Sequence, residues 1–199
     1  MIRKMRFSKT EIKHLLIAWL VISLAFGIVI NDSKFTITLL RSILLAGLTV
    51  GVGFLIHELS HKAVAQHYHC LAEFRANFQM LFLAVLMSFF GFVFAAPGAV
   101  MIFGYVSRKQ NGLISLAGPL SNLVIAALLL PLYFLTSAGI IHQIAQYGFW
   151  INSFLALFNM IPFGMFDGYK IIKWNKWIFA GMIIVSGVFT FIAFLPMFR

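Results

Sequence analysis

The sequence has few of the charged residues that cover a soluble protein. Only 10% of its 199 residues are charged, and only five are acidic, whereas 62% are hydrophobic. The mean hydropathy is +0.98. This balance lies far outside that of soluble domains and excludes an ordinary water-soluble fold. We therefore expect a protein that is embedded in a membrane.

Cysteine is almost absent, since Cys70 is the one cysteine of the chain. A single thiol excludes an intramolecular disulfide, a CxxC redox pair and a cysteine zinc cage. We expect Cys70 to have no chemical role.

The excess of basic residues gives a formal net charge of +10. These residues lie in short clusters between apolar runs and form no continuous stripe, so we expect no nucleic-acid partner. Anionic lipid headgroups and the bilayer itself are the expected surroundings of these charges.

Long apolar runs are the dominant feature of the chain. A helix needs about 20 apolar residues to cross a bilayer, and several of these runs are that long. The sequence predicts an all-α membrane protein with about five transmembrane helices. These lie at about 14–30, 37–61, 113–135, 144–163 and 177–197. Between the second and third lies the apolar segment 78–105, which glycine and proline interrupt.

The distribution of Lys and Arg indicates how 78–105 is arranged, because these residues gather in short cytoplasmic loops. If the segment returns to its own side, twelve basic residues are cytoplasmic and three are outside; if it crosses once, the counts are eight and seven. We therefore predict a re-entrant segment, with a half-helix at about 78–94. A β-hairpin from 98–105 to 112–116 is expected to follow it.

The same counts predict a multi-pass protein of the cell membrane with a cytoplasmic N-terminus. No small-residue cleavage site follows the basic N-terminal residues, so we expect the first helix to be uncleaved. We interpret 1–199 as a single membrane-embedded domain with a catalytic core at about 37–176.

The residues His-Glu-Leu-Ser-His at 57–61 carry the strongest chemical signal. On a helix, His57 and His61 share one face and can bind one zinc ion, while Glu58 between them is placed to act as a general base. The alternative is that these side chains are simply solvated at a helix end. An ionisable residue in a membrane helix is costly, however, and this favours a functional site.

A catalytic zinc ion takes three protein ligands and keeps one position open, so a third ligand is needed. His67 has the spacing of a metzincin, but the glycine which that motif requires is replaced by Val64. The other candidate is Asp167, which follows the fourth predicted helix and lies at the same membrane depth as His61 if 78–105 is re-entrant. We favour Asp167; its alternative role is a loop carboxylate paired with Lys170.

Three separated motifs together resemble the site-2 protease family of intramembrane metalloproteases. They are His-Glu-Leu-Ser-His at 57–61, Ala-Gly-Pro-Leu-Ser-Asn at 117–122, and Asn159-x-x-Pro162 followed by Asp167-Gly168. The resemblance implies one zinc ion held by His57, His61 and Asp167. It also implies cleavage of membrane-anchored proteins near the cytosolic side of the bilayer.

Asn122 and Asn159 match family asparagines that handle the unwound substrate or active-site water. The alternative for both is hydrogen bonding between helices. The chain lacks the PDZ-like and nucleotide-sensing insertions of larger relatives, so their regulation does not carry over.

The sequence is also compatible with two rival functions. One is a non-catalytic membrane protein that binds or transports a divalent metal with the same ligands. The other is an inactive relative that binds membrane segments without cutting them. Glu58 favours the protease, because a metal transporter has no need of a glutamate at that position.

Overall fold

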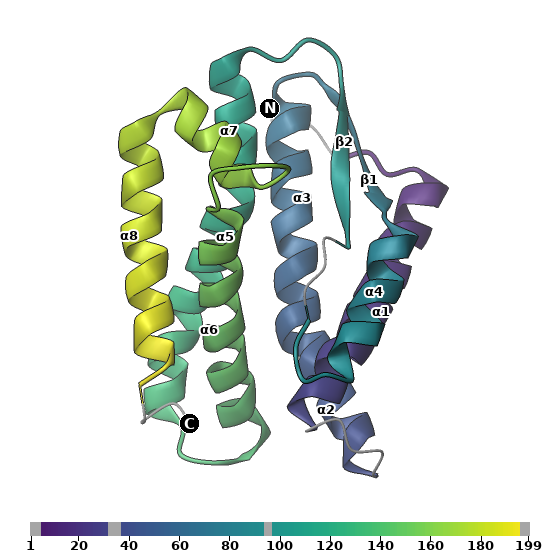
Figure 1. The fold of residues 1–199 in the computed structure, drawn as a ribbon, viewed down its shortest axis with the longest axis vertical. Helices are drawn as coiled ribbons and strands as arrows, with labels where there is room; N and C mark the ends of the chain where they lie inside the picture. The colour runs from purple at the N-terminus through teal and green to yellow at the C-terminus, as the bar shows by residue number, and fades with distance from the viewer. Residues whose placement is uncertain (1–4, 32–36, 94–96, 196–199) are drawn as a thin grey trace.

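The computed structural model is mostly helical and describes residues 5–31, 37–93 and 97–195. Its helices run side by side between two ends of the molecule, and a two-stranded sheet lies beside α3 at one end (Figure 1). The elements are α1 Lys9–Ile30, α2 Thr38–Ala46, the π-helical turn η1 Gly47–Gly51, α3 Val52–His67, β1 Leu71–Ala76, α4 Phe78–Ser88, β2 Gly98–Phe103, α5 Arg108–Leu135, α6 Gly139–Asn159, α7 Asp167–Trp174 and α8 Lys176–Ala193.

Four helical segments are long and apolar enough to cross a membrane: α1, the continuous run from α2 to α3, α5 and α8. They coincide with four of the five expected spans, although 177–197 extends beyond the described residues. The remaining expected span, 144–163, falls on α6, which is also long but contains Gln143, Gln146, Asn152 and Asn159. Among the described residues there are therefore four candidate membrane spans, as expected for a membrane protein.

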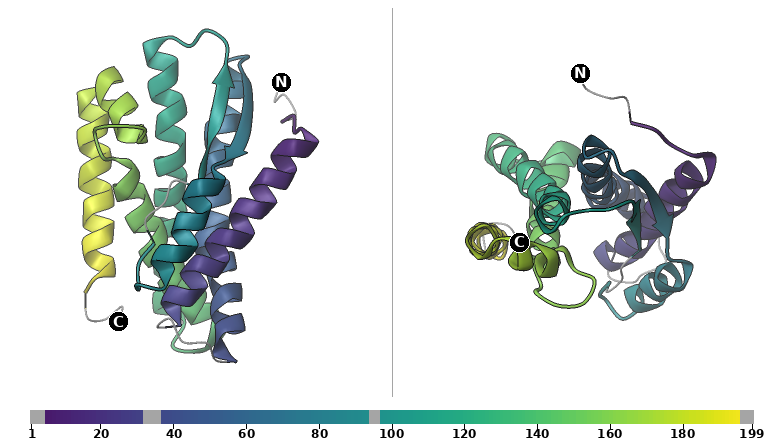
Figure 2. Two further views of the ribbon diagram at one scale, coloured as in Figure 1. Left: turned by 45° about the vertical axis from the view of Figure 1, so that its right-hand side comes forward. Right: turned by 90° about the horizontal axis from the view of Figure 1, so that it is seen from above.

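The segment after α3 leaves and returns to the same end of the molecule, as a re-entrant segment does. The chain descends through β1 and α4, and β2 returns it to the start of α5 (Figures 1 and 2). The expected half-helix is α4, although it ends at Ser88 and the end of 78–94 lies outside the described residues.

The predicted hairpin between 98–105 and 112–116 is wrong. β2 instead pairs antiparallel with β1, with Phe74 opposite Val100, and 112–116 belongs to α5. The reason is a capping box: the Ser107 side chain accepts from the backbone of Gln110, and the Gln110 side chain accepts from the backbone of Ser107. This reciprocal pair starts a helix where a hairpin turn was expected.

Two apolar clusters hold the site in place. One joins α1, α3, β1 and α4 and includes Leu15, Phe54 and Phe74. The other contains Leu123 of α5, Met160 after α6, Ile171 of α7 and Met182 of α8. The second cluster anchors the short helix α7 against the longer helices, so the start of α7 has a defined position.

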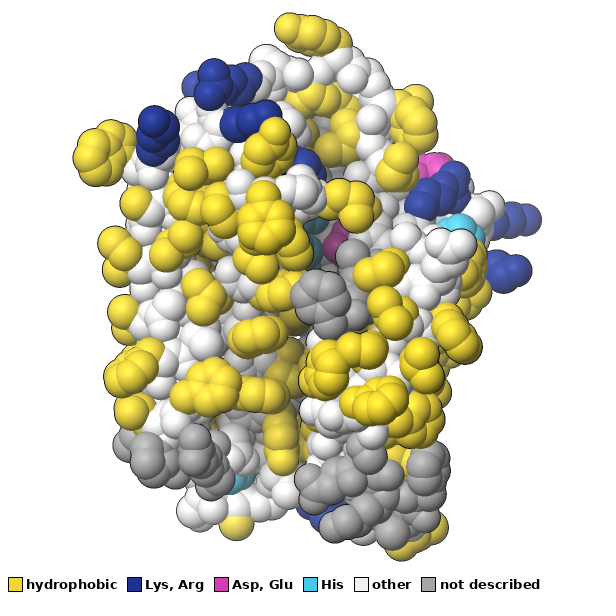
Figure 3. Space-filling model, in the orientation of Figure 1, with side chains coloured by type: hydrophobic (Ala, Val, Ile, Leu, Met, Phe, Trp, Pro, Cys, Tyr) yellow, Lys and Arg dark blue, Asp and Glu magenta, His cyan; other side chains and the backbone are white. Residues whose placement is uncertain are grey.

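Hydrophobic side chains cover most of the face seen in Figure 3, and Lys and Arg gather mainly at its upper end. In the recess at the centre of that face, histidine and acidic side chains are visible. The histidine and acidic side chains in the recess therefore lie nearer to the basic end of the molecule than to the opposite end.

Candidate metal centre

His57 and His61 lie one turn apart on α3, and both are buried. Their Nε2 atoms are 3.0 Å apart, which brings the two imidazoles to one point. The i, i+4 spacing of the sequence produces this arrangement directly, because such residues lie above one another on a helix.

Each histidine is held by a hydrogen bond from its other ring nitrogen. His57 Nδ1 donates to Oδ1 of Asn122 over 2.6 Å, and His61 Nδ1 donates to the carbonyl oxygen of Ile114 over 2.7 Å. Both partners are acceptors, so each ring carries its proton on Nδ1 and has a lone pair on Nε2. Both lone pairs are available to a metal ion.

Asp167 completes the group from the first residue of α7. Its Oδ2 lies 3.1 Å from Nε2 of His61 and 3.4 Å from Nε2 of His57. The expected alternative pairing is also present, since Lys170 Nζ lies 3.9 Å from Oδ1.

Gly168 explains how Asp167 reaches the histidines. A Cβ atom at this position would lie 2.8 Å from the carbonyl oxygen of Ile161 and would also overlap the backbone of Met160. Only glycine allows α7 to begin so close to the end of α6. The Asp-Gly pair thus brings the carboxylate over the buried imidazoles.

The site has the composition and the space that a catalytic zinc ion requires. The ligand atoms of His57, His61 and Asp167 all lie within 4.8 Å of one another. Two lone pairs and a carboxylate face one another there, so a cation is needed to balance them. Two imidazoles and one carboxylate are a known zinc set that leaves a position for water.

Gly118 of α5 makes room for the two imidazoles. A Cβ atom on Gly118 would lie 2.6 Å from Nε2 of His57 and would overlap His61 as well. The motif at 117–122 therefore contributes space through Gly118 and a hydrogen-bond acceptor through Asn122.

Glu58 is buried beside the ligands, with 8% of its surface exposed. The backbone N–H of Val100 in β2 is directed toward its carboxylate. The glutamate therefore lies between the histidine pair and the edge strand.

The other predicted residues take different positions. Asn122 is fully buried and contacts His57, Asn152 and the Gly53 carbonyl, so the alternative of hydrogen bonding between helices is present. Asn159 is half-buried and donates to Leu155 of its own helix. Contact of either asparagine with substrate stays a prediction. His67 is exposed and does not belong to the group of metal-binding side chains found among the described residues.

Sequence reasoning missed three groups: the Ile114 carbonyl, the Val100 N–H and Asn152. Two of these are backbone atoms, which no residue type identifies. Asn152 is a polar residue in an apolar helix, and this was a usable signal.

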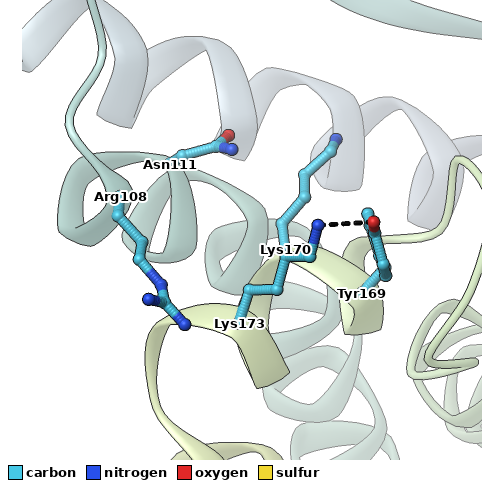
Figure 4. Close-up of a pocket in the computed structure, with 5 residues that line it drawn as sticks. All are labelled: Arg108, Asn111, Tyr169, Lys170 and Lys173. Carbon is cyan, nitrogen blue, oxygen red and sulfur yellow. Dashed lines mark hydrogen bonds between the residues drawn. The ribbon is translucent and has the colours of Figure 1, made fainter.

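A basic pocket of about 490 Å³ adjoins the centre (Figure 4). Arg108 and Asn111 line it from α5, and Tyr169, Lys170 and Lys173 line it from α7. Lys170 is shared between this pocket and Asp167. The positive charges of the basic end thus extend to the metal centre.

Comparison with known proteins agrees with this geometry. The chain is 42% identical over 178 residues to a protein of Methanocaldococcus jannaschii named "Putative zinc metalloprotease MJ0611", covering 88% of this chain and 90% of the relative. The chain belongs to this family of zinc metalloproteases. It is also 31% identical over 145 residues to "Putative zinc metalloprotease YwhC" of Bacillus subtilis, covering 63% of this chain and 66% of that protein. No family model and no solved structure matches the chain.

Membership in a zinc metalloprotease family agrees with the buried group that the structure brings together. Zinc is the expected cofactor, and His57, His61 and Asp167 form a group that can hold one ion.

Proposed function

We propose that this metalloprotease is an intramembrane endopeptidase of the site-2 protease type, which cleaves membrane-anchored proteins near the cytosolic side of the bilayer. The observation that carries the proposal is the position of the metal-binding group. His57 and His61 lie inside a helical run that is long and apolar enough to span a membrane, and Asp167 reaches them from outside that run.

The roles of the residues follow from their contacts. His57, His61 and Asp167 hold zinc, which when bound activates water and polarises a carbonyl group. Glu58 takes a proton as general base, holds it on its buried carboxylate and gives it to the leaving amine. Because Glu58 is buried, bulk water does not compete for this proton.

The sheet supports a mode of substrate binding. Two outward N–H groups of β1 are already occupied: Phe74 donates to Glu11 over 3.0 Å, and Ala76 donates to His14 over 3.2 Å. Helix α1 therefore covers the edge of β1 that does not face β2. The free edge of β2 carries the Val100 N–H that contacts Glu58.

A substrate helix hides its carbonyl groups in its own hydrogen bonds and must unwind before it is cut. We infer that the unwound segment pairs as a strand with β2, because that edge is free and leads to Glu58. Val100 then exchanges its contact with Glu58 for one with the substrate backbone.

The charge distribution supports the orientation in the membrane. Lys and Arg gather at the end nearest the metal centre, and such residues favour the cytoplasmic side (Figure 3). We therefore propose that this end faces the cytosol in the cell membrane, with the N-terminus on the same side.

The test is a cleavage assay in liposomes with a membrane-anchored substrate, run beside a zinc determination on wild type, Glu58→Gln and Asp167→Ala. We expect wild type to bind about one zinc ion and to cut within the membrane segment. Glu58→Gln should keep zinc and lose cleavage, and Asp167→Ala should lose both.

A second substrate carries the same target sequence in a soluble loop. Cleavage of the soluble form alone would refute intramembrane action and leave a metalloprotease of another kind. Zinc binding with no cleavage of either substrate, accompanied by zinc uptake into the liposomes, would favour the metal transporter.

A further inference from the structure

A chain of side-chain amides connects the metal centre to helix α6. Asn122 Oδ1 accepts from Nδ1 of His57, and Asn122 Nδ2 donates to Oδ1 of Asn152 over 2.8 Å. Asn152 Nδ2 in turn donates to the carbonyl oxygen of Gly148 over 2.9 Å. Asn122 and Asn152 are both fully buried.

The direction of this chain is set by carbonyl groups, which can only accept hydrogen bonds. The Gly148 carbonyl requires that Asn152 present its NH₂ group to it, so the oxygen of Asn152 faces Asn122. The Gly53 carbonyl accepts from Asn122 Nδ2 over 3.3 Å, on the same side of that amide. The NH₂ of Asn122 is thereby occupied, and its oxygen faces His57.

We propose that Asn152 is a positioning residue of the zinc site. It acts through Asn122, whose orientation keeps the proton of His57 on Nδ1 and the Nε2 lone pair toward the metal. Without Asn152, the amide of Asn122 is held by the Gly53 carbonyl alone, and its rotation would present a donor to His57. The inference rests on the zinc site and does not depend on the proposed intramembrane cleavage.

The physical reason lies in the cost of buried amides. Two fully buried asparagines in an apolar bundle are stable only if their donors and acceptors are satisfied. Hydrogen bonds behind a metal-binding histidine fix its tautomer, and losing such a partner lowers metal affinity by about 10–100-fold. Replacing the amide of Asn152 by an apolar side chain of similar size should therefore lower the affinity of the site for zinc.

The experiment measures zinc affinity in detergent by competition with a chelator of known affinity, with no substrate present. We expect Asn152→Leu to bind zinc about 10–100-fold more weakly than wild type. The control is Ser153→Ala, since Ser153 is equally buried on α6 but donates only to Phe149 of its own helix. This control should keep the affinity of wild type, and thermal unfolding of the zinc-free proteins shows whether each variant is folded.

A double variant tests whether Asn152 acts through Asn122. In an Asn122→Leu background, Asn152→Leu should cause no further loss of zinc affinity, because the connection is already broken. Equal losses in both backgrounds would show that Asn152 acts by another route and would overturn the proposal. Unchanged affinity in folded Asn152→Leu would do the same.

Wild type provides a measurement that needs no stable variant. Nitrogen NMR of the zinc-bound protein labelled at histidine distinguishes a proton on Nδ1 from one on Nε2, and the signal of His57 is identified by its loss in His57→Gln. We expect the proton on Nδ1. A proton on Nε2 would refute the assigned role, whatever the outcome of the cleavage assay.

Discussion

The Oδ2 atom of Asp167 lies 3.1 Å from Nε2 of His61, although the two residues are separated in the chain by the sheet, α4, α5 and α6. Asp167→Ala should therefore lower zinc affinity strongly, by at least the 10–100-fold that the loss of a supporting hydrogen bond causes. His67→Ala should leave zinc content unchanged, because His67 is exposed. Mass spectrometry of the purified proteins measures their zinc content and so distinguishes Asp167 from His67 as the third ligand. Loss of zinc in His67→Ala, with zinc retained in Asp167→Ala, would assign that role to His67.

Gly118 offers a test of the space around the metal. A methyl group there would overlap both histidines, so Gly118→Ala should lose zinc binding and cleavage together. Ala is favoured over Gly in a helix by about 1 kcal/mol, so the loss cannot be assigned to a weaker helix. Gly181→Ala on α8 is the matched control, since a Cβ atom there meets nothing within 4 Å. Normal zinc affinity in Gly118→Ala would show that the site is wider than the structure indicates.

Val100 tests the pairing of substrate with β2. Val100→Pro removes the N–H that points to Glu58 and leaves the hydrogen bonds with β1 in place, because Phe74 opposite it is bonded to Glu11. We expect zinc content to be kept. Cleavage of a membrane substrate should fall about twofold to tenfold, the size of effect that one lost backbone hydrogen bond gives.

Val100→Ala serves as the control, because it shortens the side chain and keeps the N–H. If both variants cut the membrane substrate at the rate of wild type, the substrate does not pair with this part of β2.

Glu11 and Lys62 form a fully buried ion pair between α1 and α3. Glu11→Gln leaves the charge of Lys62 without its partner, and we expect a loss of about 3–5 kcal/mol in the free energy of unfolding. The double variant Glu11→Gln with Lys62→Met removes both charges, keeps an acceptor for the Phe74 N–H and should recover most of that loss. Thermal and denaturant unfolding in detergent measures both.

Lys13→Gln, an exposed change on the same helix, is the control for α1. A stability of Glu11→Gln equal to that of wild type would mean that Lys62 reaches water when its partner is lost.

Local patterns predicted much of the molecule. The apolar runs predicted about five spans, and four of these are helical segments that can cross a membrane. The spacing of His57 and His61 predicted their convergence. Both predictions depend on residues close in the chain. The distribution of Lys and Arg predicted that 78–105 returns to its own side, and the chain between α3 and α5 leaves one end of the molecule and returns to it. The pairing of β2 was mispredicted, because Ser107 and Gln110 form a capping box in a stretch that also has the composition of a turn.

Residue types and their spacing are enough to identify an apolar membrane protein, a zinc motif on α3 and an Asp-Gly pair after α6. The strand that pairs with β2, the approach of Asp167 to the histidines, and the support of the imidazoles by Ile114, Asn122 and Asn152 become visible in the folded chain. The physical reason is that helix formation and the i, i+4 spacing are local. Strand pairing, backbone acceptors and hydrogen bonds between helices depend on contacts between distant segments, and residue type alone does not specify them.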